Sequence, residues 1–331
     1  MNLVHPLNPL NYLHYDVFTS QPLLGNQLAV FPDARGLATE QMHAIAHEIN
    51  FSETTFVFPP ERSDTDVRMR IFTPAVEMPM AGHPTVGSTF ALAHVGVIEP
   101  ARQRFVFGLN VGPTPVDLVW EGNSGASASR RKLRFVWMTQ QPPSFGAPVA
   151  DRDAVARAIG LREGDLVAGL PIQEVTCGVP YLLVPLRDRA AVDRAAPPSA
   201  NFELPGVPRA HPAILVFARE QEQVRLKADT TKGVTYSRMF APGLGVVEDP
   251  ATGSAAGPLG CYLVQHGMVG TAEAAPDGAA AGPVQVVNIQ GVKMGRASRI
   301  HMAITGAPDA ITDVKVGGEA VLVARGEFLV R

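Results

Sequence analysis

The chain of 331 residues has very few cysteines and no long apolar run. Cys177 and Cys261 are its only two cysteines, too few for a disulfide framework or a four-cysteine zinc site. No stretch of about 18 consecutive apolar residues could span a bilayer, and the opening MNLVHPLNPLNYLHY lacks the basic and apolar regions of a signal peptide. These absences exclude a disulfide scaffold and predict a cytoplasmic protein without a transmembrane segment.

The chain also lacks an excess of charge of either sign. Its 28 basic and 31 acidic residues leave a formal net charge of −3, so no basic surface for nucleic acid or an anionic membrane is expected. Hydrophobic residues make up 46% and charged residues 18% of the sequence, which is typical of a globular protein. We therefore expect a small-molecule partner, and neither nucleic acid nor a membrane.

Cofactor motifs are missing as well. Gly253 is followed by Ser254 and Ala255, whereas a phosphate loop needs lysine and then serine or threonine. Gly243-Leu244-Gly245 is not followed by the third glycine of a dinucleotide fingerprint. No lysine lies in a recognisable Schiff-base context. We predict activity without pyridoxal phosphate, flavin or metal.

One pair of histidines has the spacing of a zinc site. His43 and His47 lie four residues apart, but Glu48 falls outside the His-Glu-x-x-His order and no third ligand is apparent nearby. We interpret both histidines as solvated.

An internal repeat is the main feature that is present. Residues 70–83 read RIFTPAVEMPMAGH and residues 238–254 read RMFAPGLGVVEDPATGS, so both follow R-x-F-x-P, a short gap and E-x-P-x-x-G. Mostly apolar segments without a clean polar face follow at 86–96 and 256–267, and each predicts a buried helix. The matches occur in the same order about half the chain apart, which favours duplication over two unrelated strand-turn-helix units.

The rest of the chain is mostly strand-like. Segments rich in β-branched or aromatic residues predict strands at 54–58, 67–72, 104–107, 181–186, 213–217 and 320–325. One surface helix is expected after Thr39 as N-cap, with Met42, Ile45, Ala46 and Ile49 on one face. Segments 121–131 and 270–283, rich in glycine, alanine and serine, are expected to be mobile loops.

Two similar halves, each a curved sheet around one buried helix, would bring the matching helix starts together near a pseudo-twofold axis. Gly82-His83 and Gly253-Ser254 would then face each other across a cleft and offer free N–H groups to one anion. We predict halves at residues 1–123 and 131–331 with a linker at 124–130, and the final strand can return to the first half.

Three long segments of the sequence resemble one known family. They span residues 15–58, 70–92 (RIFTPAVEMPMAGHPTVGSTFAL) and 248–255 (EDPATGSA). Together they resemble the PhzF-like (phenazine biosynthesis) family, whose fold is similar to that of diaminopimelate epimerase. The resemblance implies an α+β fold with two pseudo-symmetric halves, each a mostly antiparallel sheet or barrel around a central helix. It also implies cofactor-independent isomerisation by proton transfer at a site between the halves.

The resemblance further implies which residues form the site. The family's Ser-Glu-Thr glutamate, which moves the proton, falls on Glu53, and its Gly-His-Pro-Thr histidine falls on His83. Its Glu-Asp-Pro aspartate falls on Asp249. The expected substrate-binding residues are Ser52, Gly82, Gly253 and Ser254.

Each proposed catalytic residue also has a purely structural interpretation. Glu53 lies at a helix-to-strand junction that can direct a carboxyl into a cleft, where partial loss of water favours acid and base action in turn; otherwise it is a solvated glutamate. His83, at a helix start, is expected to be a neutral imidazole that donates to a developing oxyanion, or else a capping or core histidine. Asp249 would bind an amino or hydroxyl group of the substrate, or cap the following turn.

Departures from the related patterns refine the prediction. Two-cysteine racemases of this fold carry a cysteine directly before each glycine, but Ala81 and Thr252 stand here, so a one-base shift by Glu53 fits better. The usual Gly-Gly-Asn-Pro reads Leu24-Gly25-Asn26-Gln27, so this turn is expected to differ.

We predict an isomerase of a small cyclic or amino-acid-like carboxylate. The alternatives are an amino-acid epimerase with a different second base and a non-catalytic carboxylate-binding protein. An uncovered sheet edge and the resemblance both point to a homodimer.

Overall fold

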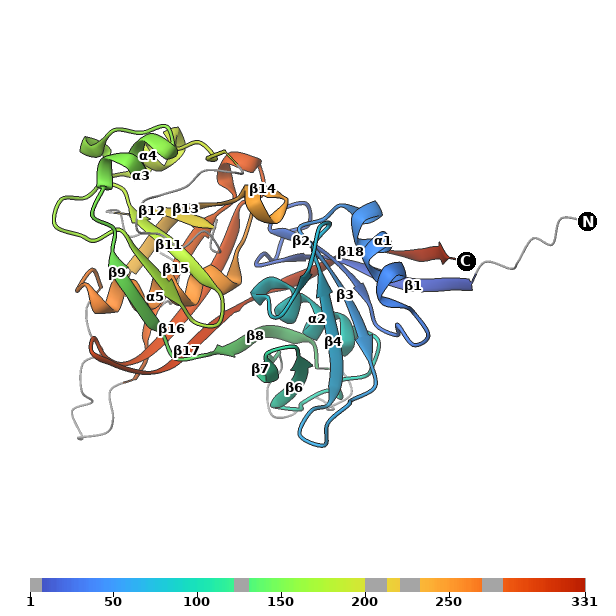
Figure 1. Cartoon of the computed structure of the whole chain (residues 1–331). Coiled ribbons are helices and arrows are strands. Elements are labelled where there is room, and N and C mark those ends of the chain that lie inside the picture. Colours follow the sequence, from blue (N-terminus) through green and yellow to red (C-terminus); the bar gives the residue numbers. More distant parts are fainter. Residues whose placement is uncertain (1–7, 122–130, 200–212, 221–232, 270–281, 331) are drawn as a thin grey trace, which may run out of the picture.

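The chain forms two lobes of strands that are joined by one continuous sheet (Figure 1). The computed structural model describes residues 8–121, 131–199, 213–220, 233–269 and 282–330. Blue and teal elements make one lobe, green to orange elements make the other, and the red C-terminal strands run through both (Figure 1).

The first half contains the following elements: β1 (Asn8–Val17), β2 (Asn26–Phe31), α1 (Thr39–Ile49), β3 (Glu53–Phe58), β4 (Val67–Phe72), β5 (Glu77–Met78), α2 (Gly82–His94), β6 (Arg104–Leu109), β7 (Gly112–Trp120) and β8 (Leu133–Gln140). The rest of the described chain contains β9 (Ser144–Pro148), α3 (Arg152–Ala158), η2 (Glu163–Asp165), β10 (Gln173–Thr176), β11 (Pro180–Pro185), α4 (Arg189–Arg194), β12 (Ile214–Arg219), β13 (Gly233–Ala241), η3 (Pro242–Leu244), β14 (Val246–Asp249), α5 (Gly253–Gln265), β15 (Val284–Gln290), η4 (Val292–Met294), β16 (Ser298–Ala307), β17 (Ala310–Gly318) and β18 (Ala320–Val330). All six predicted strands and both predicted buried helices are present.

The strands pair in the same way in both halves. The order β1-β2-β3-β4-β6-β7-β8 in the first half is matched by β10-β11-β12-β13-β15-β16-β17 in the second. Contacts β2–β3 and β4–β6 are parallel, and so are their counterparts β11–β12 and β13–β15. β5 and β14 form matching hairpins with β4 and β13. This repeated order supports duplication over two unrelated units.

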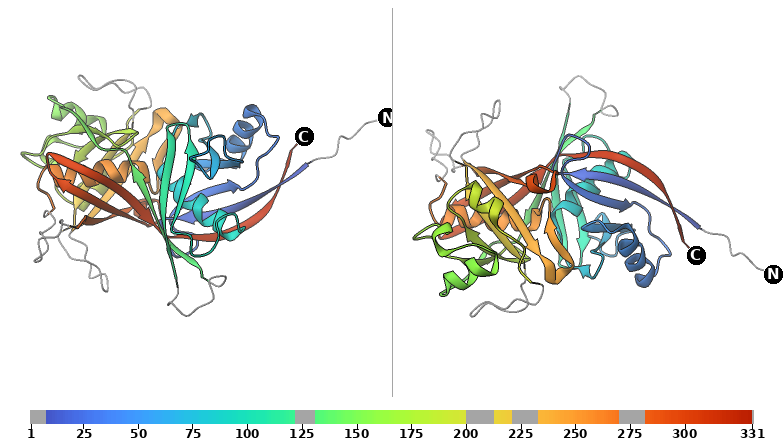
Figure 2. Two further views of the ribbon diagram at one scale, coloured as in Figure 1. Left: turned by 90° about the horizontal axis from the view of Figure 1, so that it is seen from below. Right: turned by 90° about the horizontal axis from the view of Figure 1, so that it is seen from above.

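Two strands are exchanged between the halves. β9 follows β8 but pairs with β10, and β18 follows β17 but pairs with β1 along its whole length (Figure 2). β8 and β17 pair with each other where the halves meet. The last strand therefore returns to the first half. The predicted linker, 124–130, lies outside the described residues, as does most of the two segments expected to be loops.

The two central helices are buried because neither has a polar face. Residues 82–92 of α2 and 253–264 of α5 are all buried, as expected from their composition. Glycines let the surrounding strands come close: a Cβ on Gly87 would lie 2.6 Å from Leu28, and one on Gly260 would lie 2.9 Å from Ile304. Each helix therefore packs closely against the strands that surround it.

The repeated arginine and glutamate form the same ion pair in each half. Arg70 donates through Nε and Nη2 to Glu77 at 2.8 and 2.6 Å, and Arg238 donates likewise to Glu248, with both distances 2.8 Å. Each pair joins a strand to the short hairpin that precedes a buried helix. The repeated arginine and glutamate therefore stabilise the turn that positions the start of each buried helix.

Helix α1 corrects one sequence prediction. Thr39 is not the N-cap but the first helical residue, and its hydroxyl accepts from Arg70 Nη1. The N-cap is Ala38, whose backbone N–H donates to the Gln41 side chain at 2.9 Å. Because the Gln41 side chain accepts the capping hydrogen bond, no threonine is needed at the N-cap. His47 is exposed as predicted, but His43 is half-buried beside Phe72 and is not fully solvated.

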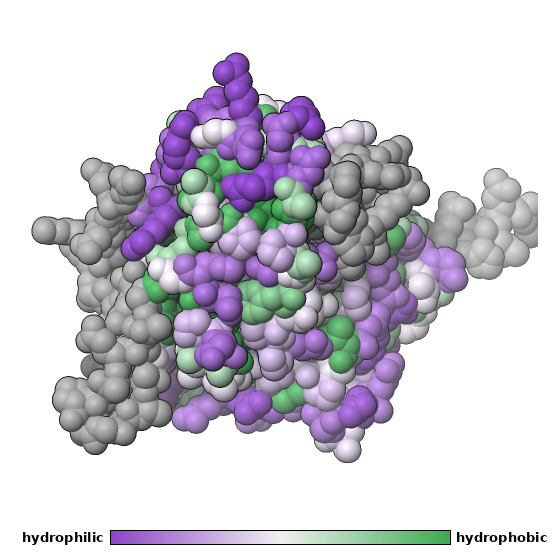
Figure 3. All heavy atoms as spheres, turned by 60° about the vertical axis from the view of Figure 1, so that its left-hand side comes forward, coloured by the Kyte–Doolittle hydropathy of each residue, from purple (hydrophilic) through white to green (hydrophobic). Residues whose placement is uncertain are grey.

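Short helices cover the outer faces of both sheets. α1 packs on Phe31, Phe56 and Phe72 of β2, β3 and β4. α3 and α4, which were not predicted from the sequence, pack on β11, β12 and β13 through residues such as Val155 and Val192. The face that Figure 3 shows carries small groups of apolar residues between polar ones.

Candidate active site

The starts of the two buried helices touch each other between the halves. A Cβ atom added to Gly82 would lie only 2.5 Å from the carbonyl carbon of Gly253. A Cβ on Gly253 would in turn lie 3.1 Å from the Cα of Gly82. A side chain at residue 82 would overlap the backbone of Gly253, so this approach requires glycine at that position. The free N–H groups of both helix starts therefore open onto one small region.

A pocket lies at this point, and all of the residues that the sequence assigned to the site line it. They are Ser52, Glu53, Gly82, His83, Asp249, Gly253 and Ser254. The other wall is largely apolar and includes Met78, Met239, Leu244 and Val246. The pocket has a volume of about 40 Å³, which holds only a few water molecules. A larger ligand therefore requires side chains of the wall to move.

Glu53 enters the pocket at the junction between α1 and β3. Asn50 ends the helix in a left-handed conformation, with φ of 55°, and so turns the chain toward the strand. β3 then begins at Glu53, which lies beside Leu28 of the parallel strand β2. The Glu53 side chain is 13% exposed. It is thus a largely buried pocket carboxylate and not a solvated loop residue.

His83 is fully enclosed and lies against this carboxylate. Its Nδ1 is 2.9 Å from Glu53 Oε2, and its Nε2 is 3.3 Å from the carbonyl oxygen of Gln27. Burial alone would lower the pKa of His83, but the negative charges of Glu53 and Asp249 outweigh it and raise the pKa above its usual range. This direction runs against the predicted neutral imidazole at the helix start, because the two nearby carboxylates favour the charged form.

Asp249 is buried at the end of β14 and accepts three side-chain hydrogen bonds. Asn26 Nδ2 and Ser52 Oγ donate to Oδ1, each at 2.8 Å, and Thr252 Oγ1 donates to Oδ2 at 2.5 Å. Burial raises the pKa of this carboxyl, while His83 and the hydrogen bonds act in the opposite direction. Through Thr252, Asp249 thus stabilises the turn before α5. Through Asn26 and Ser52 it also contacts the first half of the protein.

The two serines of the site already have partners within the protein. Ser52 donates to Asp249, and Ser254 Oγ lies 2.6 Å from the hydroxyl of Tyr181, where either oxygen could be the donor. Burial raises the pKa of Tyr181, so its phenol keeps its proton at neutral pH. Tyr181 therefore offers a second hydroxyl beside the start of α5.

Sequence reasoning missed Asn26 and Tyr181. Asn26 donates to both Asp249 and the carbonyl of Ala251, and its amide nitrogen lies 3.3 Å from His83 Nδ1. The sequence pattern places Asn26 only in a turn, although a polar residue at the start of an apolar strand is a usable signal. Tyr181 stood within an ordinary strand pattern and gave no signal.

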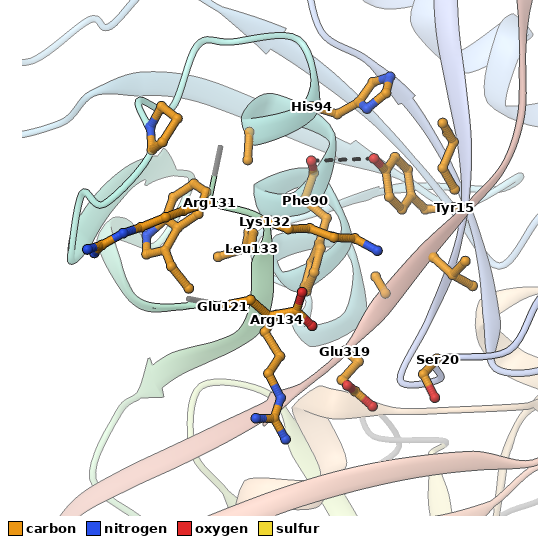
Figure 4. Close-up of a pocket in the computed structure, with 16 residues that line it drawn as sticks. Tyr15, Ser20, Phe90, His94, Glu121, Arg131, Lys132, Leu133, Arg134 and Glu319 are labelled. Carbon is orange, nitrogen blue, oxygen red and sulfur yellow. Dashed lines mark hydrogen bonds between the residues drawn. The ribbon is translucent and has the colours of Figure 1, made fainter. Parts of the chain in front are cut away.

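A larger pocket lies elsewhere, at the gap between β8 and β18 (Figure 4). It has a volume of about 640 Å³, and Arg131, Lys132, Arg134 and Glu319 surround it. Inside it, the hydroxyl of Tyr15 donates to a main-chain carbonyl of α2. None of the residues that the sequence assigned to the site lines this pocket, so the reaction is not assigned to it.

The described part of the chain contains neither a metal-binding cluster nor a membrane-spanning helix. No group of three or more histidine, cysteine, aspartate or glutamate residues there could hold a metal ion. Among the same residues, no helix has the length and apolar character needed to cross a membrane.

The chain resembles several known proteins along almost its whole length. It is 36% identical to an uncharacterized isomerase of Mesorhizobium japonicum over 97% of this chain and 99% of the relative. It is 33% identical to trans-2,3-dihydro-3-hydroxyanthranilate isomerase of Pseudomonas aeruginosa over 95% of this chain and 98% of that enzyme. The crystal structure of a PhzF-family phenazine biosynthesis protein of Bacillus anthracis superposes with a TM-score of 0.78 at 28% identity, covering 98% and 100% of the two chains.

The duplicated halves around two buried helices, together with relatives named as isomerases, identify the chain as an isomerase with the diaminopimelate epimerase-like fold. Residues 15–326 match the family described as phenazine biosynthesis-like protein. The chain belongs to this PhzF family.

Proposed function

We propose that this isomerase moves a proton within a small cyclic or amino-acid-like carboxylate, with Glu53 removing and returning the proton. The observation that carries the proposal is the contact between Glu53 and His83 in a small pocket. A carboxylate in such a site can act as base and then, once protonated, as acid. His83, with its raised pKa, would stabilise the negative charge that develops on the substrate.

The carboxylate of the substrate would lie at the two helix starts. Among the described residues that line the pocket there is no lysine or arginine, so an anion must be bound by N–H groups and hydroxyls. The N–H groups at Gly82 and Gly253 and the hydroxyl of Ser254 are suitably placed. Asp249 would contact an amino or hydroxyl group. The Pseudomonas aeruginosa relative is named as an isomerase of trans-2,3-dihydro-3-hydroxyanthranilate, and this name supports the substrate class.

The placement of the thiols favours one base over two opposed thiolates. Ala81 and Thr252 occupy the positions before the two glycines. Cys177 and Cys261 lie together elsewhere, 3.8 Å apart, and the contact with Cys177 together with burial raises the pKa of Cys261. We propose a cytoplasmic location as well, because two cysteines in a chain of 331 residues are too few for a disulfide framework. We also propose that the protein is a homodimer.

An epimerase with two different bases is the second candidate. Asp249 is the observation in its favour, because this carboxyl lines the same pocket and burial raises its pKa. In that reaction Glu53 and Asp249 would act on opposite faces of one carbon. Asp249→Asn would then abolish exchange from one enantiomer, whereas in the one-base reaction it would mainly weaken binding.

Solvent exchange in D₂O tests the proposal. The purified protein is incubated with trans-2,3-dihydro-3-hydroxyanthranilate and with a panel of small cyclic amino acids, and mass spectrometry detects deuterium in the ligand. Glu53→Gln keeps the size of the side chain but removes the base, so exchange should fall by at least about 10²-fold to 10⁴-fold. Ligand-induced thermal stabilisation should persist.

The matched control is Glu61→Gln, because the Glu61 side chain is 72% exposed and does not line the pocket. This variant should exchange at the wild-type rate. Wild-type exchange in Glu53→Gln would show that Glu53 is not the base. Ligand binding without any exchange in the wild type would favour the binding-protein alternative.

A further inference from the structure

Asn26 is a buried residue of the first half whose side chain contacts the second half. It begins β2 and is 1% exposed. Its amide nitrogen donates to Asp249 Oδ1 at 2.8 Å and to the main-chain carbonyl of Ala251 at 2.9 Å. Because a carbonyl can only accept, the nitrogen of the Asn26 amide and not its oxygen faces this turn. Both hydrogens of the amide are therefore used in binding the turn before α5.

The same amide nitrogen lies 3.3 Å from His83 Nδ1, but it has no hydrogen left to donate there. A side-chain amide carries two hydrogens, and Asp249 and Ala251 accept both. A bare Nδ1 would then face the Glu53 carboxylate without a donor. Nδ1 therefore carries a proton and donates it to Glu53 Oε2 at 2.9 Å, in agreement with the raised pKa of His83.

Gln290 of β15 reaches the same turn from the second half. It is fully buried, and its amide nitrogen donates to the main-chain carbonyl of Asp249 at 2.8 Å and to Thr252 Oγ1 at 3.0 Å. The Thr252 hydroxyl accepts from Gln290 and donates its own hydrogen to Asp249 Oδ2. Because Oδ1 already receives hydrogens from Asn26 and Ser52, both carboxylate oxygens have donors. This pattern of donors favours the ionised carboxylate.

We propose that Asn26 is a positioning residue that keeps Asp249 ionised beside His83 and binds the start of α5 to that of α2. The inference rests on the proposed function, and Asn26 is not one of the described residues that line the pocket. Asp249 contributes to the negative charge that holds a proton on His83. The carbonyl of Ala251 belongs to the turn that leads into Gly253, so Asn26 also positions the N–H groups assigned to the substrate carboxylate.

NMR of protein labelled with carbon-13 in its aspartate carboxyls tests the proposal without a substrate. The Asp249 signal is the one that is absent from Asp249→Asn, and in the wild type it should show an ionised carboxyl at about pH 7. Asn26→Leu keeps roughly the size of the side chain but removes both donors. The titration of Asp249 should then move to higher pH by about one pH unit or more, as expected for a lost hydrogen bond to a charged group. The titratable groups that face this carboxyl are His83 of α2, Glu53 of β3 and Tyr181 of β11, and the variant changes none of them.

Asn288→Leu is the matched control. Asn288 is also 1% exposed, and its amide donates to Ser237 and accepts from Thr235, so this variant loses buried hydrogen bonds too. Asn288 does not line the pocket, and the Asp249 titration should remain as in the wild type. Circular dichroism checks that each variant is folded. Asn26→Ala removes the same donors without adding bulk and is measured in parallel.

Deuterium exchange connects this network to the reaction. With trans-2,3-dihydro-3-hydroxyanthranilate, Asn26→Leu should exchange at least about tenfold more slowly than the wild type, whereas Asn288→Leu should not. A wild-type Asp249 that is protonated at about pH 7 would overturn the proposal. An unaltered Asp249 titration in both Asn26 variants, or wild-type exchange in them, would overturn it as well. If the wild type shows no exchange but Asp249 titrates as expected, the network is supported and only the Glu53 chemistry is contradicted.

Discussion

His83 and Glu53 form a buried pair, with Nδ1 and Oε2 2.9 Å apart, at the place where the two halves of the protein meet. Glu53 comes from the start of a strand and His83 from the start of a central helix. Their contact joins the proposed base to the group that would stabilise negative charge. The protonation of this pair therefore influences both stability and turnover.

Stability should fall as the pH rises above about 6.5. The pKa of His83 is raised above its ordinary value of 6.5, so the folded protein holds this proton more tightly than the unfolded chain does. The stabilisation is complete below pH 6.5 and is lost as the pH passes the folded-state pKa. One proton gives a slope of at most about 1.4 kcal/mol per pH unit. Urea unfolding of the wild type and of His83→Gln from pH 6 to 9 checks this, and the variant should lack this part of the slope.

Glu53→Gln should lower the pKa of His83. The charge of Glu53 and its hydrogen bond are the main influences that raise this pKa against burial. Titration of the imidazole by NMR measures the change directly. An unaltered His83 titration in the variant would contradict the assigned cause, and Glu61→Gln serves again as the unaffected control.

Ser254→Ala and Tyr181→Phe should mainly raise KM. The two hydroxyls are 2.6 Å apart beside the start of α5, and either can donate to a bound carboxylate. A lost hydrogen bond to a charged group costs about 1.5–3 kcal/mol, which is roughly a tenfold to hundredfold rise in KM. Because the hydroxyls contact each other, the double variant should lose less than the sum of the two single losses. Strict additivity in steady-state kinetics would show that the two act separately.

Gly82→Ala should destabilise the protein strongly. The added Cβ would lie 2.5 Å from backbone of Gly253, which cannot rotate away as a side chain could. Overpacking of this kind typically costs about 1–3 kcal/mol, and we expect the upper end of that range. Gly164→Ala is the control, because nothing lies within 4 Å of its added Cβ and its φ is not positive. Thermal unfolding compares the two, and equal midpoints would contradict the close contact.

Arg238→Met should cost more stability than Arg70→Met. Both arginines form the same ion pair, but the Arg238 side chain is 8% exposed and Arg70 is 21% exposed. Arg238 also donates to the carbonyl of Ala195, so its loss leaves more buried acceptors without a partner. Breaking such a buried pair costs about 3–5 kcal/mol, and the more exposed pair should cost less. Chemical denaturation of both variants measures the difference, and a reversed order would be inconsistent with the observed burial.

The strands and buried helices named from local pattern are all present, but local pattern did not predict the contacts between distant segments. The strand at 67–72 and the two buried helices could be predicted from their composition alone, because each of them buries mainly apolar residues. Asn26 and Tyr181 reach the pocket only because the halves are placed as they are, and no local pattern describes that placement. The charge of His83 depends in the same way on the distance to Glu53. The helices α3 and α4 span only seven and six residues, too few to show a clear period.

The pairing of β1 with β18 also determines when the sheet of the first half can be completed during synthesis of the chain. β1 ends at Val17, and its neighbour on one side begins only at Ala320, near the end of the chain. At about 5–20 residues per second, the ribosome needs roughly 15–60 seconds to make the sequence between them. During that time the first half lacks one wall strand, whereas the second half receives its exchanged strand early, from β9. The sheet of the first half can therefore be completed only when nearly the whole chain has been made.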